Sequence, residues 1–294
     1  MEWIFFSILA GFFVALSDAL NKKYWGREGY VKMALARTLG SLPFLLHLFL
    51  YLTFYEKKFI YLSLDFLENT AILLGLEILA TLFYMRAIEI SALSKSLPFL
   101  SFTPIFIVFT GYILLGERIT IVGLLGIILI ITGAYLINLQ KIREGFLAPF
   151  RGIWEERGSL FILVTAFIYG ITSVLGKRGI IMSDPLYFAG FYFSVLSFFT
   201  PLVLKMVYRI KIWEVVSKNL KGLVLVGGTQ ALMCVSHMIA LSLVETAYMI
   251  ALKRTSILFA VVLGGLIFKE QQIPLRFSAA FIMFLGILII ALWK

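Results

Sequence analysis

The sequence has little charge, one cysteine and two histidines: only 14% of its 294 residues are charged. The single cysteine, Cys234, lies inside an apolar run, which excludes an intramolecular disulfide and a cysteine-based metal site. No His-Glu-x-x-His motif, no Gly-x-Ser-x-Gly motif and no pair of aspartates within one apolar run is present. An ATP-binding loop is also missing, which argues against a primary pump in this chain. We therefore expect neither an enzyme nor a bound metal or cofactor.

Apolar residues dominate the sequence: 61% are hydrophobic, and the mean hydropathy is +1.00. A soluble domain of this length cannot bury that much apolar surface in one core. Apolar runs of about 20 residues recur along the chain, and each matches the roughly 30 Å hydrocarbon core of a bilayer. The net charge of +10 comes mostly from cations that flank these runs, which indicates contact with lipid headgroups rather than with nucleic acid. The sequence therefore predicts an integral membrane protein.

The apolar runs divide the chain into ten expected transmembrane helices. We expect these spans at Trp3–Asn21, Val31–Phe54, Thr70–Ile90, Ala92–Leu115, Ile119–Leu139, Ser159–Arg178, Pro185–Tyr208, Leu220–Leu243, Thr246–Phe268 and Ile273–Trp293. The first lacks a cationic leader and a small-residue cleavage site, so we expect a retained span rather than a signal peptide. A polar connection at 140–158 separates two halves of five spans, residues 1–139 and 159–294.

The two halves resemble each other at a nearly constant shift in residue number. The segment that closes the first span matches, 155 positions later, the segment that closes the sixth. At a shift of 153 positions, three pairs of polar residues align: Glu77 with Gln230, Tyr84 with His237, and Glu117 with Glu270. A repeat with an odd number of spans must sit the other way up in its second copy. The sequence therefore predicts an all-α integral membrane fold of ten helices in two inverted five-helix repeats, with a substrate site between them near the membrane midplane.

The ends of two spans resemble a known family. The apolar runs end in Leu-Gly-Glu at 115–117 and in Phe-Lys-Glu at 268–270, and in a ten-span chain this resembles the EamA-type members of the drug/metabolite transporter superfamily. The Lys253-Arg254 pair in the ninth span is similar to the pair with which triose-phosphate and sugar-phosphate translocators of that superfamily hold phosphate. The resemblance implies a small-molecule permease in the plasma membrane of a prokaryote.

Positive charge gathers on one side of the expected membrane. Of the 26 lysines and arginines, fifteen fall on the side of the first loop, six fall on the opposite side and five lie within spans. Under the positive-inside rule, this bias predicts a cytoplasmic first loop and both termini outside. Relatives in the superfamily are usually drawn with cytoplasmic termini, so the two criteria disagree.

Charged residues inside the expected spans are functional candidates, because a charge at mid-membrane costs about 2.5–3.5 kcal/mol. Three of them lie near span ends, where they are expected to snorkel or cap: Asp18, Glu89 and Lys95. Five lie deeper in the spans: Arg37, Glu77, Arg86, Lys253 and Arg254. Four deep cations therefore face one deep acid. Because an unpaired cation in a low-dielectric cavity is unfavourable, we expect an anion from outside to complete the site.

We expect Lys253, Arg254 and Arg86 to grip the substrate, with Arg37 as a helper. A guanidinium binds a carboxylate or phosphate through two parallel hydrogen bonds, and an ammonium adds a point charge. Adjacent positions on one helix point about 100° apart, so Lys253 and Arg254 can line one cavity only if its face on that helix is wide.

Further polar side chains are expected to line the same cavity. The hydroxyls of Thr255, Ser256 and Tyr84 either donate to a substrate or bond within the helix and pack. Glu77 is either a proton carrier for coupling and gating or the partner of a cation on another helix. His237 either titrates or hydrogen-bonds within the bundle.

These features predict a secondary transporter that moves a small polar anion, bearing phosphate or carboxylate, by alternating access. Membrane lipid and the substrate are the expected partners, with a proton or a counter-metabolite as the coupled species. One alternative is an exporter of amino acids or toxic small molecules, which the excess of deep positive charge disfavours. Another is a flippase for an anionic lipid headgroup, which the same cationic pocket would serve. A channel is disfavoured because no ring of like charges repeats across the spans.

Overall fold

The computed structural model describes residues 1–58, 62–91, 93–136, 157–268 and 276–293, which contain helices and no strand. In chain order these are α1 (Glu2–Trp25), α2 (Tyr30–Leu50), the π-turn η1 (Tyr51–Tyr55), α3 (Leu64–Ile90), α4 (Leu93–Ser96), the 3-10 turn η2 (Leu97–Phe102), α5 (Thr103–Leu115), α6 (Ile121–Leu136), α9 (Arg157–Ile181), α10 (Pro185–Tyr208), α11 (Ile212–Lys218), α12 (Leu220–Leu243), α13 (Thr246–Lys253), α14 (Ser256–Phe268) and α15 (Arg276–Trp293).

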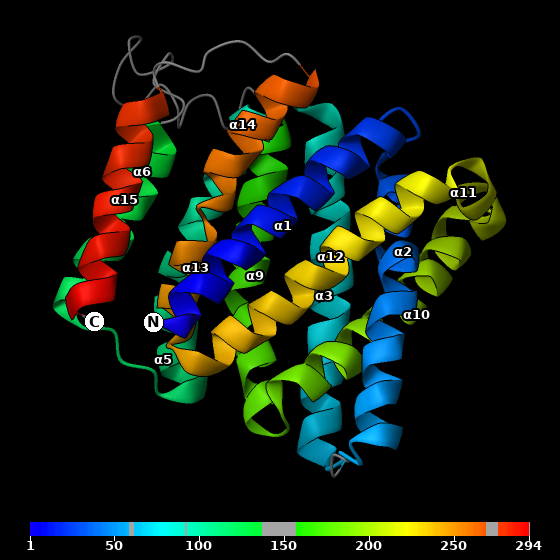
Figure 1. Cartoon of the computed structure of the whole chain (residues 1–294), viewed down its shortest axis with the longest axis horizontal. Coiled ribbons are helices and arrows are strands. Elements are labelled where there is room, and N and C mark those ends of the chain that lie inside the picture. The colour runs from blue at the N-terminus through cyan, green and yellow to red at the C-terminus, as the bar shows by residue number, and fades with distance from the viewer. Residues whose placement is uncertain (59–61, 92, 137–156, 269–275, 294) are drawn as a thin grey trace.

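The helices form one bundle, in which both chain termini lie at the same end (Figure 1). We call this the terminus end. The opposite end, where α1 passes into α2 and α10 passes into α11, we call the basic end. It holds Glu28, which accepts hydrogen bonds from Lys218 at 2.5 Å and Lys32 at 3.2 Å. These two bonds hold the pKa of the Glu28 carboxyl below its usual value and join the α1–α2 loop to α11.

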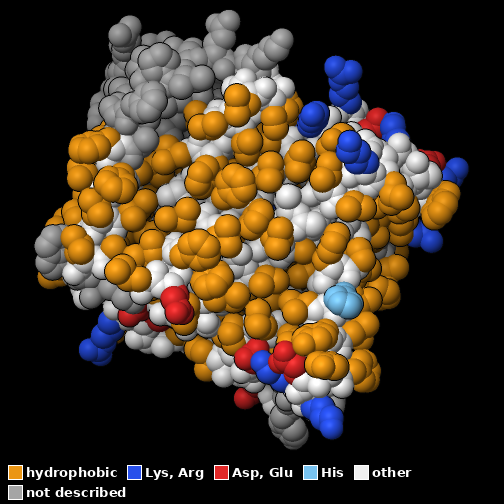
Figure 2. Space-filling model, viewed as in Figure 1, with side chains coloured by type: hydrophobic (Ala, Val, Ile, Leu, Met, Phe, Trp, Pro, Cys, Tyr) orange, Lys and Arg blue, Asp and Glu red, His pale blue; other side chains and the backbone are white. Residues whose placement is uncertain are grey.

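Seven helical segments within the described ranges are long and apolar enough to cross a membrane: α1, α2 with η1, α3, α9, α10, α12, and α13 with α14. Shorter apolar helices occupy 99–115, 121–134 and 281–292. Two expected spans, the seventh and the eighth, coincide residue for residue with α10 and α12. Hydrophobic side chains cover most of the face in Figure 2, with Lys and Arg toward its ends, as contact with lipid requires. The expected all-helical membrane fold is confirmed.

Polar side chains set where several helices begin. Ser63 accepts a hydrogen bond from the Phe66 N–H at 3.2 Å before α3. Asp184 accepts two backbone hydrogen bonds of 3.0 Å at the start of α10, where a proline occupies the first helical position. Asn219 does the same for α12 through the Gly222 N–H at 2.8 Å. Each side chain satisfies a backbone donor that has no partner inside its helix, and so the helix starts there.

Two expected spans are broken rather than continuous. The fourth consists of α4, η2 and α5, and prolines at 98 and 104 remove backbone donors in it. The ninth consists of α13 and α14, which are separated at Arg254 and Thr255. There the backbone switches to shorter-range bonds, such as Thr255 N to Leu252 O at 3.0 Å. The expected ninth span at Thr246–Phe268 is present as a membrane-spanning segment, and the break within it is an added feature that no proline or glycine in the sequence marks.

Helices from the two halves of the chain interleave in the bundle. α1 packs on α12 and α14, and α9 packs on α3 and α5 (Figure 1). α2 packs on α10, and α6 packs on α15. The cores are therefore built from both halves, so that neither half forms a separate bundle.

The contact between α2 and α12 depends on two glycines. A Cβ atom added to Gly227 on α12 would overlap the backbone of Gly40 on α2, and one added to Gly40 would overlap the carbonyl oxygen of Leu223 on α12. Small residues let helix backbones approach closely in membranes, where van der Waals contact supplies much of the association energy.

We expect Gly227→Ala to lower the free energy of unfolding by about 1–3 kcal/mol, because the two helices must separate to admit the methyl group. The measurement is thermal unfolding of the purified protein in detergent. Gly228→Ala is the matched control, since its Cβ would meet only the tip of the Phe44 ring at 3.6 Å, an ordinary contact. Equal midpoints for the two variants would show that this approach does not limit stability.

Candidate substrate cavity

A polar cavity lies inside the bundle and is lined by α1, α2, α3, α9, α10, α12 and the broken α13–α14 segment. Seven of the nine site residues expected from sequence line it: Arg37, Glu77, Tyr84, His237, Lys253, Arg254 and Ser256. Arg86 and Thr255 are not among the lining residues. The cavity brings together side chains that lie more than 200 positions apart in sequence.

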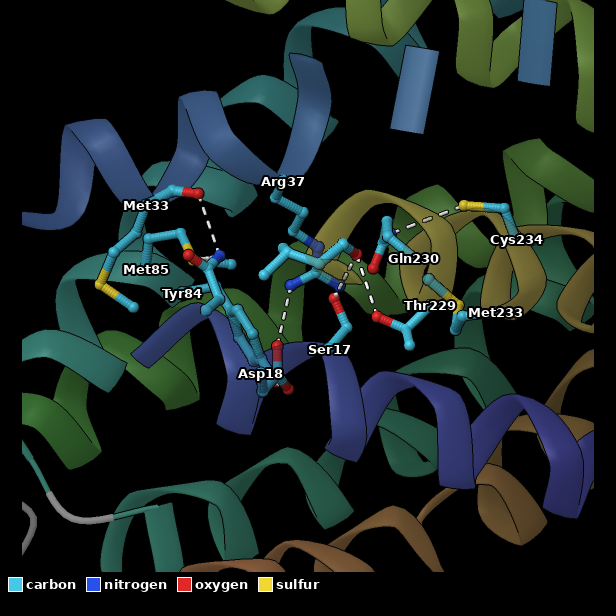
Figure 3. Close-up of polar contacts among 12 residues, drawn as sticks. Ser17, Asp18, Met33, Arg37, Tyr84, Met85, Thr229, Gln230, Met233 and Cys234 are labelled. Atoms are coloured by element: carbon cyan, nitrogen blue, oxygen red, sulfur yellow. Dashed lines mark hydrogen bonds and ion pairs between the residues drawn. The ribbon is translucent and has the colours of Figure 1, made fainter. Parts of the chain in front are cut away.

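Arg37 enters the cavity as half of a buried ion pair (Figure 3). Its Nη1 atom lies 3.0 Å from Oδ1 of Asp18 on α1, and the Tyr84 hydroxyl donates to the other carboxylate oxygen. The Arg37 guanidinium also lies 5.5 Å from the centre of the Tyr84 ring. Both carboxylate oxygens are thus satisfied within the protein, and Arg37 is fixed in position.

The burial of Asp18 corrects an expectation. We expected this acid near a span end, where it could snorkel or cap. Its residue is only 1% exposed, because α1 continues to Trp25 and leaves Asp18 inside the bundle. Asp18 therefore offsets the charge of Arg37, a pairing that no pattern in the sequence indicates.

Lys253 and Arg254 lie on the wall formed by the helix break. The Lys253 Nζ atom is 2.8 Å from Nδ1 of His237 and 3.4 Å from the sulfur of Met233 on α12. These two neighbours are not acids. The Arg254 residue is 5% exposed, and its Nε atom is buried without a hydrogen-bond partner among the described residues.

The break removes the geometric difficulty that the sequence raised for these two cations. α13 ends at Lys253 and α14 begins at Ser256, so Lys253 and Arg254 do not follow one another along a continuous helix. Both side chains can therefore line the same cavity. Ser256, at the first turn of α14, lines it as well. The N-terminus of a helix has a partial positive charge, which adds to the attraction for an anion.

Hydrogen-bond acceptors occupy other parts of the lining. Glu77 on α3 and Thr172 on α9 both line the cavity. Gln230 on α12 donates to the sulfur of Cys234 at 3.5 Å, while its Oε1 atom is buried without a partner within the described part of the chain. Thr172 and Gln230 were not among the expected site residues, although Gln230 is the sequence partner of Glu77 in the aligned halves.

Arg86 lies away from the cavity. Its Nη1 atom is 2.5 Å from Oε2 of Glu89, its side chain is 42% exposed, and its guanidinium lies 5.2 Å from the centre of the Tyr30 ring. Arg86 follows Glu77 by nine positions on α3, and nine positions correspond to a net rotation of about 180° around the helix axis. The two side chains therefore point to opposite faces of α3. This placement removes Arg86 from the expected anion grip.

Thr255 and Lys95 complete the expected set. Thr255 is buried against α1, where a Cβ on Gly11 would lie 3.0 Å from its hydroxyl oxygen. It faces a neighbouring helix rather than the cavity. The Lys95 side chain lies outside the described residues.

The charges at the cavity do not balance. The negative charge of Asp18 offsets the positive charge of Arg37. Two cations, Lys253 and Arg254, then face Glu77, which is the single acid in the described lining. One positive charge is therefore left over. Because a net charge in a low-dielectric interior is unfavourable, an anion with one negative charge would balance it.

Apolar helices around a buried, charged cavity define a multi-pass integral membrane protein. Residues 1–139 match the EamA-like transporter family. A solved structure described only as "Crystal structure of protein" is similar to this chain, with a TM-score of 0.67 and 17% identity over 98% of this chain and 94% of that chain. That likeness shows a shared fold. No curated protein matches the sequence. The family match does not extend to the triose-phosphate translocators, so that part of the resemblance stays a prediction.

Proposed function

We propose that this protein is a secondary transporter of a small polar anion that bears a carboxylate or phosphate group. The observation on which this rests is Arg254, whose buried Nε atom has no hydrogen-bond partner in the described structure and whose side chain lies beside Lys253 at a helix break. A buried donor without a partner costs about 1–3 kcal/mol, more for a charged group, and a bound anion would remove that cost. The EamA-like match over the first half of the chain supports transport as the role of the cavity.

Each charged residue of the cavity has a distinct role in this proposal. Lys253 and Arg254 grip the anionic group, while Arg37 assists from its fixed place beside Asp18. Glu77 is the coupling or gating carboxylate, because it is the acid within the described lining. Protonation of Glu77 would add a second positive charge to the cavity, and this is how a proton could be coupled to the anion.

We further propose that the fold consists of two inverted five-helix repeats that rock between two openings. Helix contacts support this, since exchanging the halves converts the α1–α12 contact into α9–α3 and the α1–α14 contact into α9–α5. The fourth and ninth spans, which the repeats would relate, are both broken. By the positive-inside rule the basic end faces the cytoplasm, in the plasma membrane of a prokaryote.

Thermal unfolding of the purified protein with a metabolite panel tests the proposal. We expect sugar phosphates, nucleotides or carboxylates to raise the midpoint, because a ligand that binds only the folded state stabilises it by about 2.7 kcal/mol at a hundred times its Kd. Quaternary amines should have no effect. Stabilisation by amino acids or amines alone would favour the exporter of amino acids or toxic compounds. Stabilisation by short-chain anionic lipids, without free phosphate compounds, would favour a flippase.

A further inference from the structure

Two lysines at matching positions in the aligned halves make the same contact at opposite ends of the bundle. Lys177, near the end of α9, donates from Nζ to the carbonyl oxygen of Val244 at 2.5 Å, just after α12 ends. Lys22, near the end of α1, donates from Nζ to the carbonyl oxygen of Ser91 at 2.5 Å, just after α3 ends. The lysines are 155 positions apart, and their acceptors are 153 apart. These are the two shifts that align the halves of the sequence.

The contact at the terminus end extends to an acid. Nζ of Lys177 lies 2.9 Å from Oε1 of Glu117, in the turn between α5 and α6. Glu117 in turn accepts from the Thr246 N–H at 3.0 Å and from the Thr246 hydroxyl at 3.0 Å, at the start of α13. The side chains of Lys177 and Glu117 are 15% and 9% exposed. We call Lys177, Glu117, Thr246 and Val244 the terminus latch, and Lys22 with Ser91 the basic latch.

The terminus latch adjoins a cavity residue, and the basic latch lies near the partner of one. Gly176, the residue before Lys177, lines the cavity. α13 begins at the terminus latch and ends at Lys253, about 11 Å away along an eight-residue helix. A shift at the latch would thus move the cation wall. On the other side, Lys22 lies one helical turn beyond Asp18, the residue that holds Arg37.

We infer that the two latches are the alternate gates of the cavity, with Lys177 and Lys22 as positioning residues that close the terminus end and the basic end respectively. This rests on the alternating access of the proposed function. Both latches are formed together in this structure. Breaking the terminus latch frees α13 from α9 and the α5–α6 turn, while breaking the basic latch separates α1 from the end of α3.

Cys234 is a built-in reporter for the experiment. It is the only cysteine of the chain, it lines the cavity, and it is 1% exposed. The full chain is reconstituted in vesicles of known orientation, and an anionic, membrane-impermeant methanethiosulfonate is applied from one side at a time. We expect Lys177→Ala to raise the rate of Cys234 labelling from the terminus end about tenfold, since loss of one buried charged hydrogen bond shifts an equilibrium by about that factor. Lys22→Ala should raise the rate of Cys234 labelling from the basic end only.

Matched variants separate gating from general loosening. Arg178→Ala removes an exposed cation next to Lys177 and should label at the wild-type rate from both sides. Glu117→Gln keeps an acceptor for Thr246 but loses the charge that holds Lys177, and it should act in the same direction as Lys177→Ala. It also decides the case if Lys177→Ala does not fold. Faster labelling from both ends, faster labelling from the same end in both lysine variants, or unchanged rates would overturn the inference.

The labelling is measured without substrate, so its outcome is independent of the anion grip. If the latch variants behave as expected while no anion stabilises the protein, the gates stand and the proposed substrate class fails. If anions bind but labelling does not depend on the side, the substrate class stands and the gates fail.

Discussion

Replacing Arg254 with alanine is expected to weaken binding of a stabilising anion by about 30- to 100-fold. The Nε atom of its guanidinium is buried without a hydrogen-bond partner among the described residues, so a bound anion would form charge-assisted hydrogen bonds with the group. Hydrogen bonds to charged groups contribute about 1.5–3 kcal/mol each, which gives a loss of this size. Lys253→Ala should cost less, because the Lys253 ammonium already contacts His237 and Met233. The measurement is a titration of the anion against the thermal midpoint of each variant.

Arg86→Ala is the matched control for Arg254→Ala. It removes the same charge from the same protein, yet Arg86 is paired with Glu89 and lies away from the cavity. We expect its affinity for the anion to stay within about twofold of the wild type, since exposed charges are screened. Equal losses in both variants would mean that overall positive charge, rather than the cavity wall, attracts the anion. The affinity of Arg254→Lys for the anion should lie between those of the wild type and Arg254→Ala, because an ammonium keeps the charge and loses the two parallel hydrogen bonds.

The seven long membrane-spanning segments of the described structure could be predicted from sequence because lipid imposes a length. An apolar run must cover the hydrocarbon core, so its ends are marked by polar residues on either side. This is why the predicted limits of α10 and α12 agree with the structure at both ends. The start of α10 has a further local signal in Asp184 followed by a proline, and α12 has one in Asn219.

The candidate site could be predicted in outline because charge inside a membrane is costly and therefore rare. That cost singled out Arg37, Glu77, Lys253 and Arg254, and the fold brings all four to one cavity. Arg86 is also a charged residue deep within an expected span, yet it lies away from the cavity. The depth of a residue along a span does not indicate the direction in which its side chain points. The helical period alone would have placed Arg86 opposite Glu77 on α3.

Long-range partners could not be predicted from single segments. The Asp18–Arg37 ion pair joins α1 to α2. Asp18 is buried there because α1 continues to Trp25, beyond the end of the apolar run. The break between α13 and α14 has no local signal, and tertiary packing against α1 at Gly11 accompanies it. Both features decide which cations remain available for a ligand. The charge balance of the cavity therefore could not be predicted from the sequence alone.

Breaking the Asp18–Arg37 pair is expected to have the largest effect on stability. Asp18→Asn leaves Arg37 charged and buried with no acid to offset it, and removing one partner of a buried ion pair costs about 3–5 kcal/mol. Thermal unfolding in detergent measures the loss. An anion that binds the cavity should stabilise Asp18→Asn more than the wild type, because the freed Arg37 guanidinium then needs a partner.

The double variant Asp18→Leu with Arg37→Met distinguishes an uncompensated charge from lost packing. Removing both charges together should restore much of the stability that Asp18→Asn loses, since an apolar pair of similar volume leaves no buried charge. A double-mutant cycle built on Asp18→Leu and Arg37→Met singly would then give a large coupling energy. Additive losses would instead show that the two residues stabilise α1 and α2 separately. In that case the attraction between the two charges would contribute little to stability, and Arg37 could turn toward an anionic substrate at small cost.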